Sequence, residues 1–93
     1  KHYRQYEQTM YSVVSADTTA LIVLSKGDFN RVVYSSKHSE VVFGFTIVPI
    51  QINHDPLLLI KAGMPETYML WTSLLVFDGT GYQVATYQRV NMY

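Results

Sequence analysis

The sequence has no cysteine, so a disulfide, a thiolate metal site and a thiol nucleophile are all excluded. It also lacks an excess of either charge, because seven Lys and Arg residues balance seven Asp and Glu residues. This balance argues against a surface that holds nucleic acid phosphates. The longest unbroken apolar run, Ala20–Leu24, is far shorter than the ~20 residues that a membrane-spanning helix needs.

The sequence is instead rich in apolar residues. Hydrophobic residues make up 48% of the 93 positions, and eight of them are tyrosines. This composition excludes a disordered segment, and the length predicts a single domain over residues 1–93. A chain this short buries only about 60–65% of the surface that its unfolded form exposes, so a thin core is expected. Tyrosines are typical of interfaces and of partly solvated pockets, because the ring is apolar and the hydroxyl group is polar.

Residues 17–26 predict one short buried helix. Asp17 can accept hydrogen bonds from the free amides at a helix start, and Gly27 can close the helix in a left-handed conformation. The competing interpretation is a core strand, which the β-branched residues Ile22 and Val23 favour. The preceding stretch, residues 1–14, fits a helical stripe and a short strand equally well.

The rest of the chain has the pattern of antiparallel strands. Strands are expected over Phe29–Ser35, Val41–Ile52, Leu57–Ala62, Tyr68–Phe77 and Tyr82–Val90. The long segment 41–52 is apolar on both faces, with Phe43 and Phe45 on the same one, and Pro49 requires a bulge or a sheet edge. Together with the helix, these strands predict an α+β fold that is mostly antiparallel β-sheet.

Asp78–Gly81 predicts the tight turn of a β-hairpin with Gly79–Thr80 as its two-residue loop. On this register Phe77 faces Tyr82, Leu75 faces Val84, Ser73 faces Thr86 and Trp71 faces Gln88. Tyr87 then lies on the opposite face of the hairpin from Trp71.

Two of the expected strands are apolar on both faces, which is more than one short helix can cover. Two explanations stay open. The remaining strands can fold over and close a small barrel or sandwich, or a partner chain or an apolar ligand can cover the second face.

No group of residues predicts catalysis. His2, His38 and His54 are far apart and lack neighbouring metal ligands, so neither a metal nor a cofactor is expected. Ser36–Glu40 contains serine, histidine and a carboxylate, but it has the pattern of a solvated loop. A small hydrolase would need such groups to converge in a pocket. The sequence therefore predicts a protein that is not an enzyme.

The candidate ligand-binding residues form an apolar, largely aromatic set with a few hydroxyl groups. The set comprises Phe43, Phe45, Trp71, Ser73, Leu75, Phe77, Tyr82 and Tyr87. Small-molecule pockets have this chemistry, and a bile salt or similar amphiphile would bury its flat apolar body there. The alternative is that these side chains simply pack on each other.

In outline the chain resembles the periplasmic C-terminal domain of ToxR-like membrane-anchored transcription regulators of vibrios, of the VtrA type. The resemblance rests on the length, the absence of an initiator methionine, a short helix followed by the strands above, and an end just past a strand at Tyr93. It covers the whole chain without a short diagnostic motif. ToxR itself carries a cysteine pair in this domain, and this chain has none.

The resemblance implies a single periplasmic sensor domain of an inner-membrane protein. Such a domain forms an obligate heterodimer with a small companion of the VtrC type, and the pair completes a lipocalin-like β-barrel. The barrel binds bile salts and activates type III secretion (virulence) genes. DNA and the membrane would be reached only through an N-terminal domain and a helix upstream of Lys1.

A second hypothesis does not use the resemblance. The chain can be a small structural or assembly protein, viral or secreted, whose apolar sheet face mediates self-association.

Overall fold

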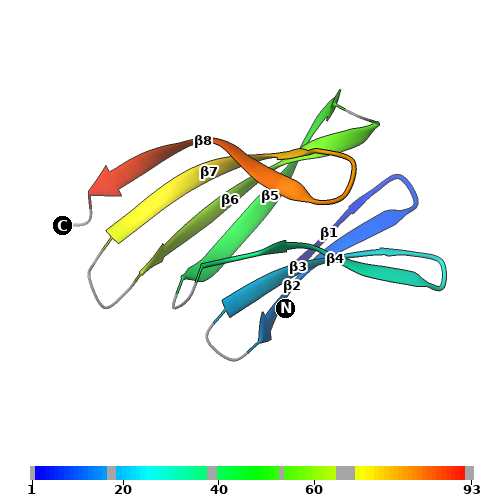
Figure 1. Cartoon of the computed structure of the whole chain (residues 1–93), viewed down its shortest axis with the longest axis horizontal. Coiled ribbons are helices and arrows are strands. Elements are labelled where there is room, and N and C mark those ends of the chain that lie inside the picture. The colour runs from blue at the N-terminus through cyan, green and yellow to red at the C-terminus, as the bar shows by residue number, and fades with distance from the viewer. Residues whose placement is uncertain (1, 17–18, 38–39, 53, 65–68, 92–93) are drawn as a thin grey trace.

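The computed structural model describes residues 2–16, 19–37, 40–52, 54–64 and 69–91. These residues form two four-stranded antiparallel sheets (Figure 1). The N-terminal sheet has the order β1 (His2–Tyr6), β2 (Thr9–Ala16), β3 (Thr19–Lys26), β4 (Phe29–Ser35). The C-terminal sheet has the order β5 (Val41–Ile52), β6 (Asp55–Met64), β7 (Met69–Phe77), β8 (Tyr82–Asn91). In each sheet, strands that are consecutive in sequence are neighbours.

The helix predicted over residues 17–26 is wrong: Thr19–Lys26 is strand β3, and residues 17–18 lie outside the described part. Buried and half-buried side chains alternate along β3, as the period of a strand requires. Gly27 does adopt the left-handed conformation (φ 61°), but it closes the turn of the β3–β4 hairpin. The fold is therefore all-β instead of α+β, and the described residues contain no helix that could cross a membrane.

The predicted strands are confirmed with small changes. Two have the expected bounds, and β6 is longer, beginning at Asp55 after a turn in which His54 has a positive φ of 69°. Pro49 lies where the β5–β6 register shifts, and β5 is an edge strand, as the missing N–H group requires.

The core lies between the two sheets. Its buried side chains are Tyr11, Ala20, Ile22, Leu24 and Val33 from the N-terminal sheet and Val42, Phe45, Leu58, Ile60, Ala62, Leu75, Phe77 and Tyr82 from the C-terminal sheet. The inner face of each sheet is thus covered by the other sheet and not by a helix. The described strands do not close into a barrel.

Two aromatic residues link the sheets through the core. Tyr82 is 3% exposed and donates its hydroxyl to the Pro56 carbonyl at 2.7 Å. Its ring meets that of Tyr11 edge to face at 6.2 Å between ring centroids. Burial raises the pKa of both phenols, so both stay protonated at neutral pH.

β-Bulges decide which side chains share a face. In β5 a register shift between Val42 and Gly44 leaves Phe45 buried and Phe43 47% exposed, so the prediction that these two phenylalanines share a face is wrong. In the β7–β8 hairpin, Phe77 faces Tyr82 as predicted.

A second shift follows at Leu74/Leu75, and Ala85 has no partner in the ladder. Beyond it Ser73 faces Tyr87 and Trp71 faces Arg89, so the predicted pairs with Thr86 and Gln88 are wrong. The extra residue moves Tyr87 to the face that carries Trp71.

The hairpin turn is held by the carboxylate of Asp78. Its Oδ1 atom accepts hydrogen bonds from the Gly81 and Thr80 backbone N–H groups and from the Thr80 hydroxyl, each at 2.9 Å. These donors, Gly81 first, lower the pKa of Asp78 from 3.8 to about 2.

We expect Tyr82→Phe to lower the free energy of unfolding by about 1–3 kcal/mol, because the buried Pro56 carbonyl loses its donor. Urea unfolding of the 93-residue chain measures the change. Tyr3→Phe, at a side chain that is 49% exposed, is the control and should change stability by less than about 0.5 kcal/mol. Equal effects of the two substitutions would contradict the role given to the Tyr82 hydroxyl.

We expect Asp78→Asn to destabilise the protein in a pH-dependent way. Because the folded pKa of Asp78 is depressed, its charge stabilises the fold above the ordinary value of 3.8, and this contribution is lost as pH falls toward about 2. Thermal unfolding of both proteins across this range should show a stability difference that shrinks on acidification. A difference that is independent of pH would refute the assignment.

Candidate functional site: a groove at the open seam between the sheets

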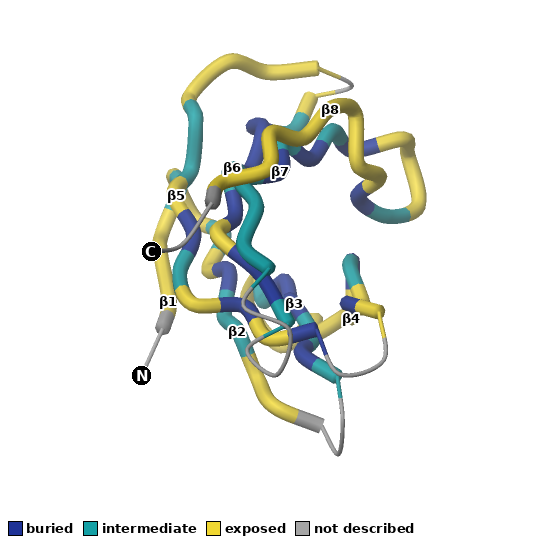
Figure 2. Tube along the Cα trace, turned by 90° about the vertical axis from the view of Figure 1, so that its left-hand side faces the viewer, coloured by how far each residue is buried: buried dark blue, intermediate teal, exposed yellow. Residues whose placement is uncertain are grey.

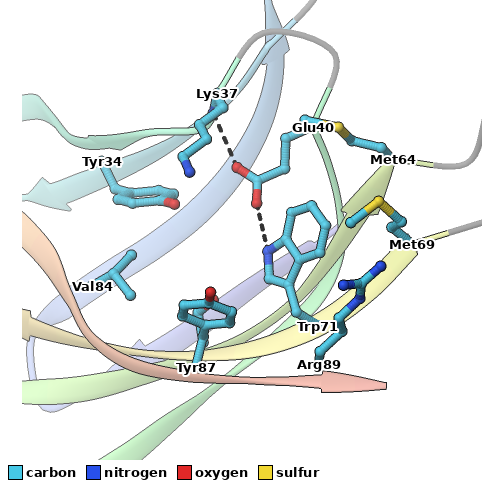
Figure 3. Close-up of a pocket in the computed structure, with 10 residues that line it drawn as sticks. Tyr34, Lys37, Glu40, Met64, Met69, Trp71, Val84, Tyr87 and Arg89 are labelled. Carbon is cyan, nitrogen blue, oxygen red and sulfur yellow. Dashed lines mark hydrogen bonds between the residues drawn. The ribbon is translucent and has the colours of Figure 1, made fainter. Parts of the chain in front are cut away.

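A groove with a cavity volume of about 430 Å³ lies where the two sheets fail to join. Its walls come from the end of β4, the β4–β5 connection, and strands β7 and β8 (Figure 3). The lining residues are Tyr34, Lys37, Glu40, Met64, Met69, Trp71, Ser73, Val84, Tyr87 and Arg89. The volume is within the range of small-molecule sites, about 300–1,000 Å³.

The groove exists because β4 and β8 are both edge strands. The turn before β8 approaches β4, where a Cβ atom on Gly81 would lie 3.0 Å from the Val33 carbonyl oxygen. No ladder joins β4 to β8 among the described residues, and β8 is exposed along most of its length (Figure 2). Side chains line the space between these two edges, and no backbone hydrogen bonds of a ladder cross it among the described residues.

The β8 bulge supplies the lower wall of the groove. Because it moves the register by one residue, Tyr87 and Arg89 stand opposite Ser73 and Trp71 on the inner face of the hairpin. Without the extra residue, Tyr87 and Arg89 would lie on the outer face.

Glu40 organises the upper wall. Its side chain is 4% exposed, and its two carboxylate oxygens accept hydrogen bonds from the Trp71 indole N–H at 2.7 Å and the Lys37 backbone N–H at 3.0 Å (Figure 3). Hydrogen bonds to an ionised carboxylate are the stronger kind. They fix the indole plane of Trp71, which forms part of the groove floor.

Ser36 ties the same turn to the N-terminal sheet. Its hydroxyl accepts a hydrogen bond from the Ala20 backbone N–H at 2.8 Å and lies 3.1 Å from the Glu40 carbonyl oxygen. Its backbone N–H donates to the Ala20 carbonyl. The expectation that residues 36–40 form a solvated loop is therefore wrong for Ser36 and Glu40, which are 5% and 4% exposed. His38 and Ser39 lie outside the described residues.

Tyr34 contributes a neutral hydroxyl to the upper wall. Burial, followed by the nearby charge of Glu40, raises the pKa of Tyr34 to about 12. The phenol therefore remains protonated at neutral pH and can donate a hydrogen bond to a molecule in the groove.

Two exposed cations flank the groove on opposite walls. Lys37 lies beside Tyr34, and Arg89 lies beyond Trp71 and Tyr87 (Figure 3). Among the described lining residues Glu40 provides the one carboxylate, and two N–H groups already hydrogen-bond to it. The groove thus combines an apolar and aromatic surface with positive charge at its margins.

Three of the eight predicted ligand-binding residues line this groove: Trp71, Ser73 and Tyr87. Four others are buried in the core: Phe45, Leu75, Phe77 and Tyr82. Phe43 belongs neither to the core nor to the groove and is exposed. The structure therefore brings together the residues of β7 and β8 and not those of β5.

Sequence reasoning missed the other seven lining residues as site residues. Val84 had been placed on the Trp71 face without a role in binding. Lys37 and Glu40 were assigned to a solvated loop, and Arg89 was displaced by the bulge that the pattern does not reveal. Tyr34, Met64 and Met69 carry no local signal, since only tertiary packing brings them to this seam.

The described residues contain no group of three His, Asp or Glu side chains that could hold a metal ion. His54 is exposed, and the contacts of the Ser36 hydroxyl are all with backbone atoms.

No protein family model, curated protein or solved structure is significantly similar to this chain. The function must therefore be inferred from the groove and the surfaces around it.

We expect Glu40→Gln to lower the free energy of unfolding by about 1.5–3 kcal/mol, because it removes the charge that accepts the Trp71 and Lys37 N–H groups. Urea unfolding monitored by fluorescence of Trp71, the single tryptophan of the sequence, measures the change. Glu7→Gln, at an exposed turn position, is the matched control and should be nearly neutral. If both variants unfold like the wild type, the carboxylate does not organise this wall.

Proposed function

We propose that this chain is a non-catalytic sensor domain that binds an amphipathic anion of the bile-salt class in the groove between β4 and β8. The observation that carries the proposal is the composition of the groove: an aromatic and thioether surface between two cations. An amphiphile with a flat apolar body and one charged end matches both parts.

The apolar part of the ligand would lie on the floor of the groove. Trp71 and the two methionines, Met64 and Met69, offer polarizable surfaces, and the Tyr87 ring, which is 65% exposed, is free to cover a bound molecule. Burial of apolar area yields roughly 25 cal/mol per Å². Most of the binding free energy would come from this contact.

The charged end would lie near Lys37 or Arg89. A carboxylate or sulfonate can accept hydrogen bonds from the Arg89 guanidinium or the Lys37 ammonium group. Both side chains are exposed, so each ion pair would add only about 0.2–1 kcal/mol. The protonated Tyr34 hydroxyl and the Ser73 hydroxyl could meet hydroxyl groups on the ring system.

As part of the same proposal, the domain is the periplasmic part of a membrane-anchored transcription regulator and pairs with a small companion chain of the VtrC type. The edge strands β4 and β8 support this reading because a strand of a companion could extend either sheet. Ligand binding would then change the proportion of paired chains through a differential affinity. The output would be transcription of type III secretion genes.

Titration with taurodeoxycholate below its micellar concentration, followed by Trp71 fluorescence, tests the binding step. We expect saturable quenching or a spectral shift, and a dissociation constant that is higher by up to roughly fivefold for the double variant Lys37→Gln/Arg89→Gln, since the one exposed ion pair contributes about 0.2–1 kcal/mol whichever cation forms it. Lys61→Gln, which removes an exposed cation outside the groove, is the matched control.

The wild type and the Lys61→Gln variant should bind alike. An uncharged detergent of similar size should bind no more tightly to the wild type than to the double variant. Absence of any saturable change with taurodeoxycholate, or equal weakening by Lys61→Gln, would refute the proposed site.

A further inference from the structure

The outer face of the N-terminal sheet is an uncovered apolar surface. The ladder pairs Tyr3 with Ser12, Ser12 with Val23 and Val23 with Val32, so one row of side chains crosses all four strands on this face. We call this surface the outer face of the N-terminal sheet; its apolar residues are Tyr3, Met10, Val14, Leu21, Val23 and Val32.

These side chains are not part of the core. Tyr3, Val14 and Val32 are 46–49% exposed, and the alternate residues on the same strands, such as Ile22, face the core instead. None of the side chains that the structure describes on this face carries a charge. The outer face of the C-terminal sheet differs, since exposed Lys61, Gln83 and Gln88 lie on it.

The size of the outer face is just below the lower limit for a specific interface between two copies. At ~4.8 Å between strands and ~3.4 Å per residue, strands of five, eight, eight and seven residues cover roughly 450 Å². Two such faces in contact therefore bury roughly 900 Å², close to the ~1,000 Å² that specific complexes require. This area is that of the whole face, which its six apolar residues share with polar ones such as Gln5, Ser12 and Ser25. Exposed apolar patches of a few hundred Å² are typical of interaction sites.

The absence of charge favours a second copy as the occupant. In a two-fold symmetric contact the same face meets itself, so a charge near the two-fold axis would approach its own copy. An uncharged sheet face avoids that penalty and can pack on its own copy, as the sheets of a β-sandwich do.

We propose that two copies of this chain associate through the outer faces of their N-terminal sheets to form a two-fold symmetric dimer. The contact is independent of the proposed ligand site, because the groove opens between β4 and β8 on the inner side of both sheets. Both grooves stay accessible in such a dimer. An interface of this area is at the small end of specific contacts, so we expect the dimer to form only as concentration rises.

Sedimentation velocity of the 93-residue chain over a range of concentrations tests the proposal. The wild type should shift from monomer to dimer as concentration rises. Val14→Lys/Val32→Lys places two like charges on each face, and the dissociation constant should rise at least roughly tenfold. Val90→Lys is the matched control: Val90 is 46% exposed, as Val14 is, but lies on β8 of the other sheet.

A second double variant, with the opposite charge, distinguishes a lost interface from a folding defect. Val14→Glu/Val32→Glu alone should also be monomeric, and an equimolar mixture with the lysine variant should recover a dimer because opposite charges then meet. Taurodeoxycholate titration of the lysine variant should match that of the wild type, which separates this interface from the groove.

The proposal would be overturned if the wild type sediments as a monomer at every concentration, or if it forms larger open assemblies in place of a dimer. Dissociation caused by Val90→Lys, or no dimer in the mixture of the lysine and glutamate variants, would overturn it as well. A failure to bind taurodeoxycholate would leave the dimer intact and count against the groove alone.

Discussion

The buried carboxylate of Glu40 is the interaction on which the arrangement of the two sheets depends. It lies at the end of the connection between them, and its oxygens accept N–H groups from Lys37 on one side and Trp71 on the other. Ser36 joins the same turn to Ala20 of the N-terminal sheet. A buried charge is tolerated only when such donors surround it. These bonds join the connection between the sheets to β7 of the C-terminal sheet and to β3 of the N-terminal sheet.

In the described part of the chain, the edges of β4 and β8 are not paired, and the groove lies between them. A closed barrel would pair every strand edge, whereas β1, β4, β5 and β8 are all edge strands here, and β4 and β8 border the groove. Gly81, in the turn before β8, permits a close approach to Val33 of β4, and the β8 bulge turns Tyr87 and Arg89 into the gap that remains. The groove is thus a direct result of a sandwich that does not close.

The apolar excess of the chain is divided between the interior and the surface. The inner faces of both sheets, including Tyr11 and Tyr82, cover each other and supply the core. The outer face of the N-terminal sheet and the aromatic groove remain in contact with solvent. Because a 93-residue domain has a high ratio of surface to volume, two layers of sheet cannot hide both faces of every apolar strand.

Alternation of apolar residues and the Asp78–Gly81 turn were enough to predict the antiparallel strands from Phe29 onward and the start of the final hairpin. They were not enough for residues 19–26, where strand and helix patterns coincide and only pairing with β2 and β4 decides for the strand. The sequence alone determined the absence of thiol chemistry, the balance of charge and the excess of apolar surface. Tertiary structure decided which faces meet and which side chains line the groove, because a single bulged residue in β5 or β8 shifts the side chains that follow to the opposite face.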